Sequence, residues 1–425
     1  MALLPALLLV LTGQMKTIVP FHAAARFFAV TGFTLLLLQP LLAARFKWIE
    51  RPVGLDRIFA FHRITGMTAA VFAVLHPVML ALGSKSFAIL TSFDSPWQIS
   101  IGRIALLVLL LFGAAAVFRA GLKIPFQLWF RMHNAVTPVI VGGVFIHSWF
   151  TAVRFMPLPL RILWFILLFV SLYSYLHLTV YQRLTARKKS FSVSSVNPVT
   201  GNIWEIEMIP PKGSTLFRYL PGQFLFLTFL RGRGLPVEEH PFTISSSPSE
   251  RDHIAVAVKE SGDFTLSIGR TKPGDRAAIL APYGRFSYLL HRERKRLVFI
   301  AGGIGVTPLL SMLRYMAHLK TGKDTTLFYA NRTEADIAFR EELEAIAGSS
   351  SLPRLNLVHI LSKPGEAWKG ERGRVNCSLM KKHLGSLDET GFYICGPPPM
   401  MDSIAAELLL NGVAGSDVHM EKFAL

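Results

Sequence analysis

The sequence contains little that could crosslink the chain or bind a structural metal. Its 425 residues include only two cysteines, Cys377 and Cys395, which excludes a disulfide framework and a four-cysteine zinc site. So few cysteines fit a cytosolic location for the half of the chain in which both lie. Acidic residues are also scarce, with 27 Asp and Glu against 45 Lys and Arg, which gives a formal net charge of +18.

Features of several common functional classes are missing as well. The basic residues form no stripe interleaved with aromatic side chains, so we expect no nucleic-acid partner despite the positive charge. Residues 2–12 are apolar but lack the basic segment of a signal peptide, so we do not interpret them as one. We find no catalytic triad and expect no acid–base chemistry by side chains.

Long apolar runs, in contrast, are abundant. Hydrophobic residues make up 51% of the chain and the mean hydropathy is +0.42, values typical of a membrane protein. Residues 1–182 hold most of these runs, with 14 Lys and Arg against 3 Asp and Glu. The predicted spans are about 23–44, 58–82, 101–119, 133–153 and 160–182. Residues 2–12 alone are short for a bilayer core of ~30 Å, but an extension through 13–20 would give a sixth span.

The basic residues predict how these spans are oriented. Six spans place both ends of this part on one side of the membrane, and cytoplasmic loops are enriched in Lys and Arg. The loops 45–57 and 119–132 and the segment after the last span carry eleven basic residues, against about four on the opposite side. We therefore expect a multi-pass protein of the cell membrane, embedded in the lipid bilayer, whose second half is cytoplasmic.

Two of the predicted spans carry histidine pairs with the same spacing. His62 and His76 lie in one span and His133 and His147 in another, with thirteen residues between the members of each pair. An offset of fourteen residues is about 40° short of four helical turns, so both rings of a pair project from nearly one face, roughly 21 Å apart. In parallel helices these rings would form two stacked bis-histidine sites, as two b-type haems require.

Other interpretations of the polar residues in the spans stay open. The histidines could be unrelated core residues, a transition-metal site or a proton relay, but none of these needs a second layer at matching spacing. His22 and His177 have no partner at such spacing and are interpreted as structural. The small residues near the four histidines would leave room for porphyrins: Gly66, Ala69, Ala73, Thr137 and Gly143.

Three arginines near the span ends have two interpretations. They are Arg26, Arg63 and Arg103. Each side chain could simply reach the membrane interface. Alternatively, each could pair with haem propionates, and Arg26 could steer an anionic product or dioxygen.

After residue 182 the sequence is typical of a water-soluble protein. Residues 183–190 (RLTARKKS) form a basic linker. Short apolar or alternating runs with turn signals predict an antiparallel β-barrel over residues 191–292. From 293 to 425, strand-like runs alternate with helical patterns, which predicts a parallel α/β sheet.

Two loops of the α/β part end strands at one edge of that sheet. The segment from Gly302 to Pro308 reads GGIGVTP and links a strand to an amphipathic helix, so its backbone amides could approach a pyrophosphate. It is not the GxGxxG fingerprint. Cys395, followed by Gly396 and Pro397, ends another strand, so the two loops predict a crevice in which Cys395 is either a packed or a functional thiol.

Two further segments in the predicted barrel carry polar groups of interest. HPFTISS starts at His240, and its hydroxyls and amides could hold a flavin ring and ribityl chain. Gly262, Asp263, Phe264 and Thr265 open a short predicted helix, a second place for an anion.

The chain resembles the NADPH oxidase and ferric reductase family over roughly residues 20–425. The features that carry this resemblance are the matched histidine spacing and the motifs HPFTIS, GGIGVTP and CGPPPM, in that order. The family joins a six-helix di-haem membrane domain to a dehydrogenase similar to ferredoxin–NADP reductases. The resemblance implies a membrane domain over 1–182, with six helices or five plus a short first span. It further implies an FAD domain over 191–292 and an NAD(P)H domain over 293–425.

The resemblance also implies roles for individual residues. FAD would be bound by His240, Pro241, Phe242, Thr243, Ser245, Lys259, Gly262, Asp263, Phe264 and Thr265. The nicotinamide nucleotide would be bound by Gly302, Gly303, Gly305, Thr307, Pro308, Cys395, Gly396 and Pro397. Arg332 would meet a 2′-phosphate, which favours NADPH, with NADH as the alternative. Glu421 and Phe423 match the family's terminal segment, in which an aromatic covers the flavin until nicotinamide displaces it.

The expected function is electron transfer from cytosolic NADPH through FAD and two b-type haems to an acceptor across the membrane. Dioxygen, giving superoxide, is the first hypothesis, and a ferric or cupric metalloreductase is the second. A membrane electron donor to a partner protein is the third, and a haem-free transporter is the remaining alternative. No calcium-binding or activation segment is seen in the sequence. We therefore expect a minimal, constitutively active bacterial form without an obligatory activating subunit.

Overall fold

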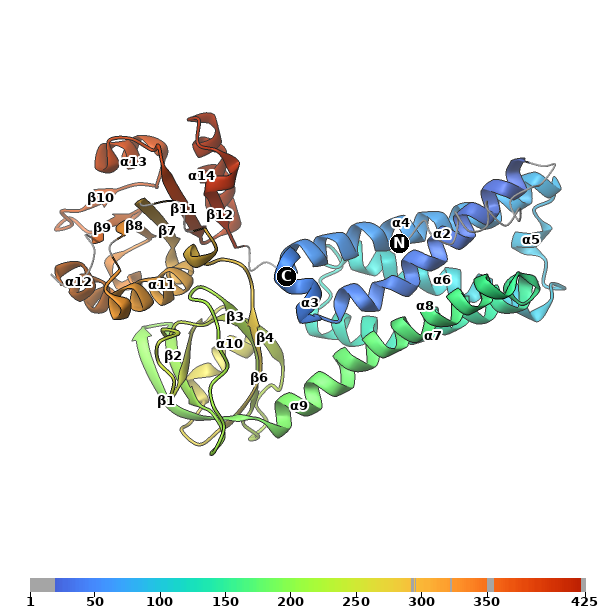
Figure 1. Ribbon diagram of the computed structural model, residues 1–425, viewed down its shortest axis with the longest axis horizontal. Coiled ribbons are helices and arrows are strands. Elements are labelled where there is room, and N and C mark those ends of the chain that lie inside the picture. Colours follow the sequence, from blue (N-terminus) through green and yellow to red (C-terminus); the bar gives the residue numbers. More distant parts are fainter. Residues whose placement is uncertain (1–19, 292–293, 295, 322, 350–354, 422–425) are drawn as a thin grey trace. The chain divides into compact units, whose positions relative to one another are not determined.

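The computed structural model describes residues 20–291, 294, 296–321, 323–349 and 355–421. The chain divides after Gln182 into two compact units. The first is helical and the second contains two β-sheets with helices (Figure 1). The residues predicted to be a linker, 183–190, are helical up to Lys188.

Five long helices build the described part of the first unit. They are α2 (Pro20–Ala43), α4 (Leu55–Ser84), α6 (Trp97–Phe118), α7 (Phe126–Thr151) and α8 (Leu158–Leu176). Shorter elements are α3 (Lys47–Val53), α5 (Ala88–Thr91), a 3-10 turn (Val153–Phe155), a π turn (His177–Tyr181) and α9 (Gln182–Lys188). The sixth predicted span, 2–12, lies outside the described residues.

Four segments in the described residues are long and apolar enough to cross a membrane: Pro20–Ala43, Leu55–Ser84, Trp97–Phe118 and Leu158–Lys188. The fifth predicted span, 133–153, is helical as part of α7 but is not in this set. It carries two histidines and Asn134 among its apolar residues. A helix of this kind has to place its polar face against protein or a bound group rather than lipid.

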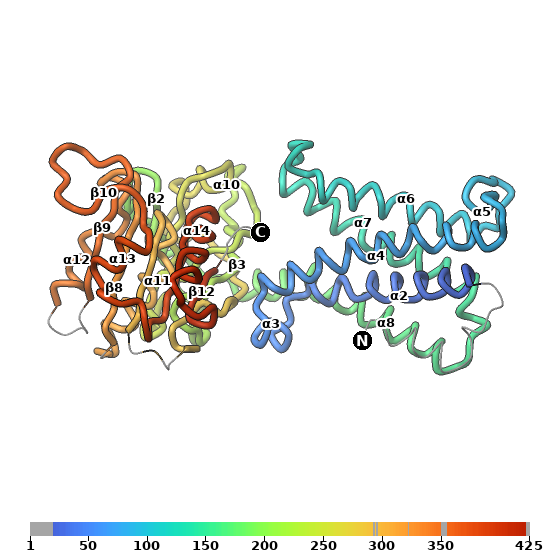
Figure 2. Tube along the Cα trace, turned by 90° about the horizontal axis from the view of Figure 1, so that it is seen from above, coloured from blue at the N-terminus to red at the C-terminus, as the bar shows by residue number. Residues whose placement is uncertain are grey.

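The long helices pack in pairs. α2 lies along α4, and α6 lies along α7 (Figure 2), whereas the backbones of α4 and α7 lie farther apart. A buried cluster with Phe33, Leu37, Leu160 and Trp164 joins α2 to α8. Proline interrupts three of the long helices, at Pro40, Pro77 and Pro138, so each proline leaves one carbonyl without its usual amide donor.

The first sheet of the second unit is antiparallel, in the order β4-β3-β6-β1-β2-β5. Its strands are β1 (Phe191–Thr200), β2 (Ile203–Ile209), β3 (Phe224–Leu230), β4 (Glu239–Thr243), β5 (Ile254–Lys259) and β6 (Arg276–Tyr283). One antiparallel bridge, from Ile244 just after β4 to Val256 within β5, connects the two edge strands. α10 (Asp263–Leu266) follows β5.

The second sheet is parallel throughout, in the order β10-β9-β8-β7-β11-β12. Its strands are β7 (Arg296–Gly302), β8 (Asp324–Asn331), β9 (Leu355–Leu361), β10 (Glu371–Arg372), β11 (Thr390–Cys395) and β12 (Val418–Met420). The two edge strands, β10 and β12, are the shortest strands of the sheet.

Helices cover both faces of the parallel sheet (Figure 1). α11 (Val306–Leu319) and α12 (Arg340–Gly348) pack on one face, and α13 (Cys377–Leu384) and α14 (Pro398–Leu410) on the other. Alternate residues of β7 face the two cores, Phe299 one and Ile300 the other. The predicted succession of an antiparallel sheet and a parallel α/β sheet is therefore confirmed.

Candidate functional site

The four spaced histidines meet as two pairs between α4 and α7. The ring centroids of His62 and His133 lie 6.3 Å apart with an interplanar angle of 80°. Those of His76 and His147 lie 6.4 Å apart at 68°. Since the first histidine of one helix meets the first of the other, the two helices run in the same direction. The fourteen-residue offset separates the two pairs by ~21 Å along the helices.

The geometry of both pairs fits an iron ion with one imidazole on each side. An iron–nitrogen bond of about 2 Å, plus about 1 Å from nitrogen to ring centre, predicts centroids about 6 Å apart. In the described residues no group of three or more His, Cys, Asp or Glu could hold a metal ion. Two imidazoles alone leave most coordination positions of an iron ion open, and a porphyrin supplies four of them. The pairs therefore fit haem better than a bare metal.

Backbone carbonyls orient the second pair of rings. Nδ1 of His76 lies 3.0 Å from the carbonyl oxygen of Ala25 on α2. Nδ1 of His147 lies 2.8 Å from the carbonyl oxygen of Gln98 on α6. A carbonyl only accepts, so Nδ1 donates in both contacts and Nε2 keeps its lone pair for a metal. Gly102 leaves room for this contact, because a Cβ there would lie 2.5 Å from Nδ1 of His147.

Side chains from two elements hold His133. Its ring stacks on Trp129 at 5.1 Å between centroids. Pro138 removes the amide that would bond the carbonyl of Asn134, and the Tyr175 hydroxyl on α8 donates to that oxygen at 2.9 Å. The backbone beside His133 is thereby tied to another helix.

The three candidate arginines lie in different surroundings. Arg26 and Arg63 are exposed, and Arg26 follows Ala25, the residue that orients His76. Arg103 donates from Nε to the carbonyl oxygen of Ile89 at 2.9 Å and from Nη2 to Oγ of Ser95 at 2.8 Å. Its guanidinium therefore fastens the connection between α4 and α6.

Three of the small residues predicted to leave room for porphyrins contact other helices in the structure. A Cβ on Gly66 would lie 3.4 Å from Oε1 of Gln39 on α2. Ala69 is fully buried with Leu35 and Leu36 of α2. A Cβ on Gly143 would lie 3.3 Å from Ala105 of α6. Their small size serves the close packing of α2 with α4 and of α6 with α7.

In the second unit, the fold brings the two predicted flavin segments together. The ring of His240, on β4, stacks on Phe264 of α10 at 4.1 Å between centroids. The ring centroid of Phe242 lies 6.4 Å from that of Phe264. Pro241 pairs with Phe226 of β3. Phe264 itself is 4% exposed and belongs to the core of the sheet. Phe264 therefore supports the His240 ring from the core of the antiparallel sheet.

The other predicted flavin residues surround this contact. Thr243 ends β4, and Lys259 ends β5. Ser245 is fully buried, and its hydroxyl donates to Oε1 of Glu205 at 2.8 Å. At the start of α10, before Asp263, the hydroxyl oxygen of Thr265 accepts from the Gly262 amide at 2.9 Å. That amide is satisfied within the chain.

The glycine turn and the Cys395 loop touch each other at the carboxyl edge of the parallel sheet. A Cβ on Gly305 would overlap the carbonyl oxygen of Cys395 and lie 2.6 Å from its carbonyl carbon. A Cβ on Gly396 would lie 3.0 Å from the backbone nitrogen of Gly302. Gly303, at φ +54°, has open space around it. The two loops thus form one glycine-lined edge that lets a nucleotide approach the backbone.

The remaining predicted nucleotide residues lie around this edge. Thr307 and Pro308 are buried in the first turn of α11, and Pro397 is exposed before α14. Cys395 is 1% exposed, and burial, followed by the charge of Glu421, raises the pKa of its thiol. At neutral pH the group is a packed, protonated thiol.

Two predicted residues lie farther along the chain. Arg332 is exposed two residues after Ala330, which pairs with Gly302 in the sheet, so it follows the strand next to the glycine turn. Phe423 lies outside the described residues. Glu421 is described, and a Cβ on Gly284 would lie 2.6 Å from its Oε1.

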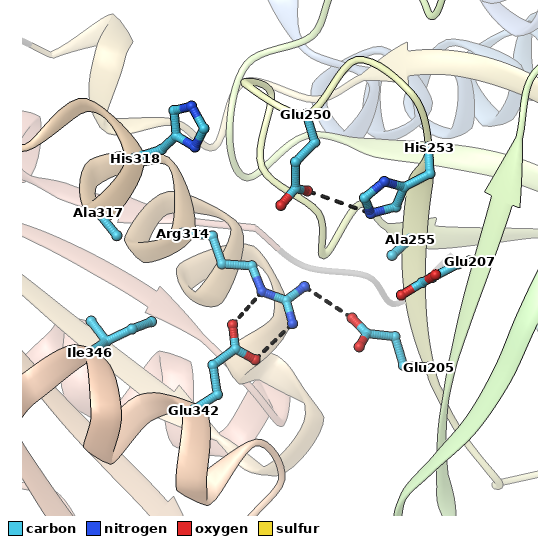
Figure 3. Close-up of a pocket in the computed structure, with 10 residues that line it drawn as sticks. All are labelled: Glu205, Glu207, Glu250, His253, Ala255, Arg314, Ala317, His318, Glu342 and Ile346. Carbon is cyan, nitrogen blue, oxygen red and sulfur yellow. Dashed lines mark hydrogen bonds and ion pairs between the residues drawn. The ribbon is translucent and has the colours of Figure 1, made fainter.

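An ion network next to these sites was not predicted from the sequence. Arg314 of α11 bonds Glu342 of α12 through two nitrogens, at 2.6 and 2.7 Å, and Glu205 of β2 at 3.0 Å (Figure 3). Burial lowers the pKa of Arg314, but the hydrogen bonds and charges of both carboxylates outweigh it and raise that pKa. The network lines a cavity of about 630 Å³ together with Glu207, Glu250 and His253.

Three family models match the chain in succession. The ferric reductase like transmembrane component matches residues 28–144, an FAD-binding domain matches 188–272, and an oxidoreductase NAD-binding domain matches 299–406. The first match contains three of the four paired histidines, His62, His76 and His133. The predicted FAD-binding and NAD-binding parts are thereby confirmed.

Curated relatives and one solved structure are similar to parts or all of the chain. The xylene/toluene monooxygenase electron transfer component XylA of Pseudomonas putida is 29% identical over 57% of this chain and 67% of its own length. NADH-cytochrome b5 reductase 2 of Mycosarcoma maydis is 32% identical over 41% and 51%. The chain therefore spans about half to two thirds of these relatives. The solved structure of flavohemoglobin from Malassezia yamatoensis matches 95% of this chain and 96% of its own chain, with a TM-score of 0.51. The two sequences are 18% identical, so the similarity concerns the fold alone.

Proposed function

The three matches confirm the predicted resemblance to the NADPH oxidase and ferric reductase family, with its ferredoxin–NADP reductase-like part, and from that premise we propose a transmembrane electron-transfer function. Electrons from cytosolic NADPH would pass through FAD and two b-type haems to an acceptor across the membrane. The observation that carries the proposal is the pair of matched imidazole sites, 6.3 and 6.4 Å between centroids, on α4 and α7.

The residues of the chain have distinct tasks in this proposal. The glycine edge at Gly302 and Gly305 would bind the pyrophosphate of NADPH, and the HPFTIS segment would hold the flavin. When bound, FAD accepts a hydride and releases electrons singly, and haem carries single electrons. His62 and His133 would hold one haem, and His76 and His147 the other, with the Nδ1 contacts of the second pair fixing its tautomer.

We propose dioxygen as the acceptor. One NADPH and two dioxygen molecules would give NADP⁺, one proton and two superoxide ions, which balances two electrons. The segment 83–100 between α4 and α6 has only Lys85 and Asp94 as charged residues, so it offers no acidic or histidine-rich surface to gather metal ions. Arg26, beside the carbonyl that orients His76, would supply positive charge near the second haem.

The test uses the purified full chain with added FAD and haem. We expect a b-type reduced-minus-oxidised spectrum with about two haems per chain, and NADPH-driven dye reduction that superoxide dismutase suppresses. Fast reduction of ferric chelates without dye reduction would replace dioxygen by a metal acceptor. Absence of any Soret band after haem supplementation would refute the haem assignment itself.

A partner protein is the second candidate acceptor, because one relative is named as the electron transfer component of a monooxygenase. In that case the reduced haems would reoxidise slowly in air and quickly when the partner is added. Stopped-flow reoxidation of the prereduced protein in air separates the two functions, since an oxidase reoxidises without any addition.

Replacing Arg332 with alanine should weaken NADPH binding without affecting NADH. The guanidinium would lose a charge-assisted contact with the 2′-phosphate, so we expect the KM for NADPH to rise about 10-fold. The KM for NADH should stay within about 2-fold. Steady-state kinetics with both nucleotides measures this, and Arg270→Ala, an exposed arginine in the antiparallel sheet part, controls for the loss of one positive charge. Equal changes for both nucleotides would remove the 2′-phosphate assignment.

A further inference from the structure

One helix connects the nucleotide edge to the flavin segment. α11 begins directly after the glycine turn, with Val306 as its first residue. About one and a half and two turns later, Ser311 and Arg314 lie on one face of the helix and reach the end of the HPFTISS sequence. The Ser311 hydroxyl donates to the carbonyl oxygen of Ser246 at 2.8 Å. Nη1 of Arg314 donates to the carbonyl oxygen of Ser245 at 3.0 Å.

Arg314 is the centre of this contact. Its guanidinium bonds Glu342 bidentately and also bonds Glu205 (Figure 3). The same carboxylate oxygen of Glu205 accepts from the Ser245 hydroxyl. The side chain is 17% exposed and that of Glu205 is 14% exposed. Charge-assisted, bidentate pairs of this kind are stronger and more directional than single neutral hydrogen bonds.

The flavin segment is also held from its other side. The hydroxyls of Tyr219 and Ser246 lie 3.0 Å apart, and the amide of Ala255 donates to the same Ser246 hydroxyl at 3.0 Å. Ser245 and Ser246 are both buried. The segment is therefore clamped between the antiparallel sheet and α11, the helix that begins at the nucleotide turn.

We infer that Arg314 and Ser311 are positioning residues that set the distance between the nicotinamide nucleotide and the flavin. Neither is among the residues proposed to bind a cofactor. Arg314 and Ser311 fix the backbone carbonyls of Ser245 and Ser246 in the flavin segment to the helix that directly follows the glycine turn. Val306 and Arg314 lie in the same regular helix, so the distance between the glycine turn and the flavin segment varies little. The inference rests on the proposed flavin and nucleotide sites but not on haem or on the final acceptor.

Removing the guanidinium should displace the two parts rather than empty either site. Without Arg314, the carboxylates of Glu205 and Glu342 would face each other without their shared cation, in a cavity also lined by Glu207 and Glu250. Unpaired, partly buried like charges repel. Lysine would restore the charge but not the fork that serves three acceptors at once.

The experiment is anaerobic stopped-flow reduction of FAD by NADPH in the full-length holoprotein. For Arg314→Met we expect the limiting rate to fall about 30-fold, while the dissociation constant of NADPH stays within about 3-fold. Arg314→Lys should recover part of the rate, with a loss of about 5-fold. Ser311→Ala, which removes a single hydrogen bond, should lose about 3-fold. FAD content and the melting temperature are measured for each variant.

Arg340→Met is the matched control. Arg340 lies on the neighbouring helix α12, pairs with Glu334 and Glu344 and is 42% exposed, so it should leave the limiting rate within about 2-fold. An unchanged rate in both Arg314 variants would overturn the inference, as would an equal loss in the Arg340 variant. If the wild-type protein failed to reduce flavin at all, the proposed function would fail instead, and the two outcomes are therefore distinct.

Discussion

Replacing His147 with alanine is expected to stop electron delivery to the acceptor while NADPH still reduces the flavin. His147 and His76 would hold the second proposed haem, and loss of one of these two imidazoles would leave that group with a single protein ligand. We expect haem content to fall from about two to about one per chain and acceptor reduction to fall at least about 100-fold. The remaining haem would lie ~21 Å short of the lost one, too far for efficient onward transfer.

Two measurements on one preparation test this expectation. Haem is quantified from the b-type spectrum, and flavin reduction is followed by stopped flow, with its rate expected to stay within about 2-fold of wild type. His177→Ala is the matched control. His177 lies in the same unit, but its ring stacks on Phe46 at 4.6 Å and has no histidine partner at matching spacing. A His147 variant that retained both haems, or that also lost flavin reduction, would contradict the assignment.

The sequence was sufficient to predict the histidine pairs because their signal is local and periodic. A fixed offset along a helix determines which face a residue occupies, so the matched spacing in two helices already implied that the rings meet. For the same reason the glycine turn could be placed between a strand and a helix. Both predictions depend on residues close in sequence and on regular backbone geometry.

The groups that orient these histidines could not be predicted in this way. The acceptors for His76 and His147 are backbone carbonyls of Ala25 and Gln98, and every residue type carries a carbonyl. Gly102 illustrates why the role of a glycine cannot be predicted from the sequence alone. It leaves room for the His147 ring, which belongs to another helix. Only the packing of the helices reveals these contacts.

The small residues near the histidines have a second explanation, which the sequence did not suggest. Gly66, Ala69 and Gly143 lie near the histidines in sequence, so they were expected to leave room for porphyrins. A helix has several faces, however, and these residues occupy the faces that pack against α2 and α6. Small size in a membrane helix serves close helix packing at least as often as ligand space.

The Arg314 network was missed because its members are far apart in sequence. Glu205, Arg314 and Glu342 belong to β2, α11 and α12, and isolated charged residues in amphipathic elements are usually solvated. Their spacing carries no periodic signal. The contact depends on how the two sheets of the second unit pack, which sequence patterns do not determine.

Replacing Gly305 with alanine is expected to abolish NADPH-driven flavin reduction by distorting the nucleotide edge. A Cβ at this position would overlap the carbonyl oxygen of Cys395 and lie 2.8 Å from Cα of Gly396. Both are backbone atoms, which cannot rotate away as a side chain would. We expect a loss of at least about 3 kcal/mol of stability in this part of the chain, and of at least about 100-fold in the rate of flavin reduction at fixed NADPH.

Two other glycines separate the possible causes of this effect. Gly303 has open space but a φ of +54°, so alanine there should cost only about 1 kcal/mol in backbone strain. Its Cβ would enter the space that we propose for the nucleotide. Gly348, at the end of α12, has open space and no positive φ, so its alanine variant should behave as wild type. Thermal unfolding without nucleotide and titration with NADPH distinguish the three. If Gly305→Ala melted and bound NADPH like Gly348→Ala, the close contact between the glycine turn and the Cys395 loop would have no role in holding the nucleotide.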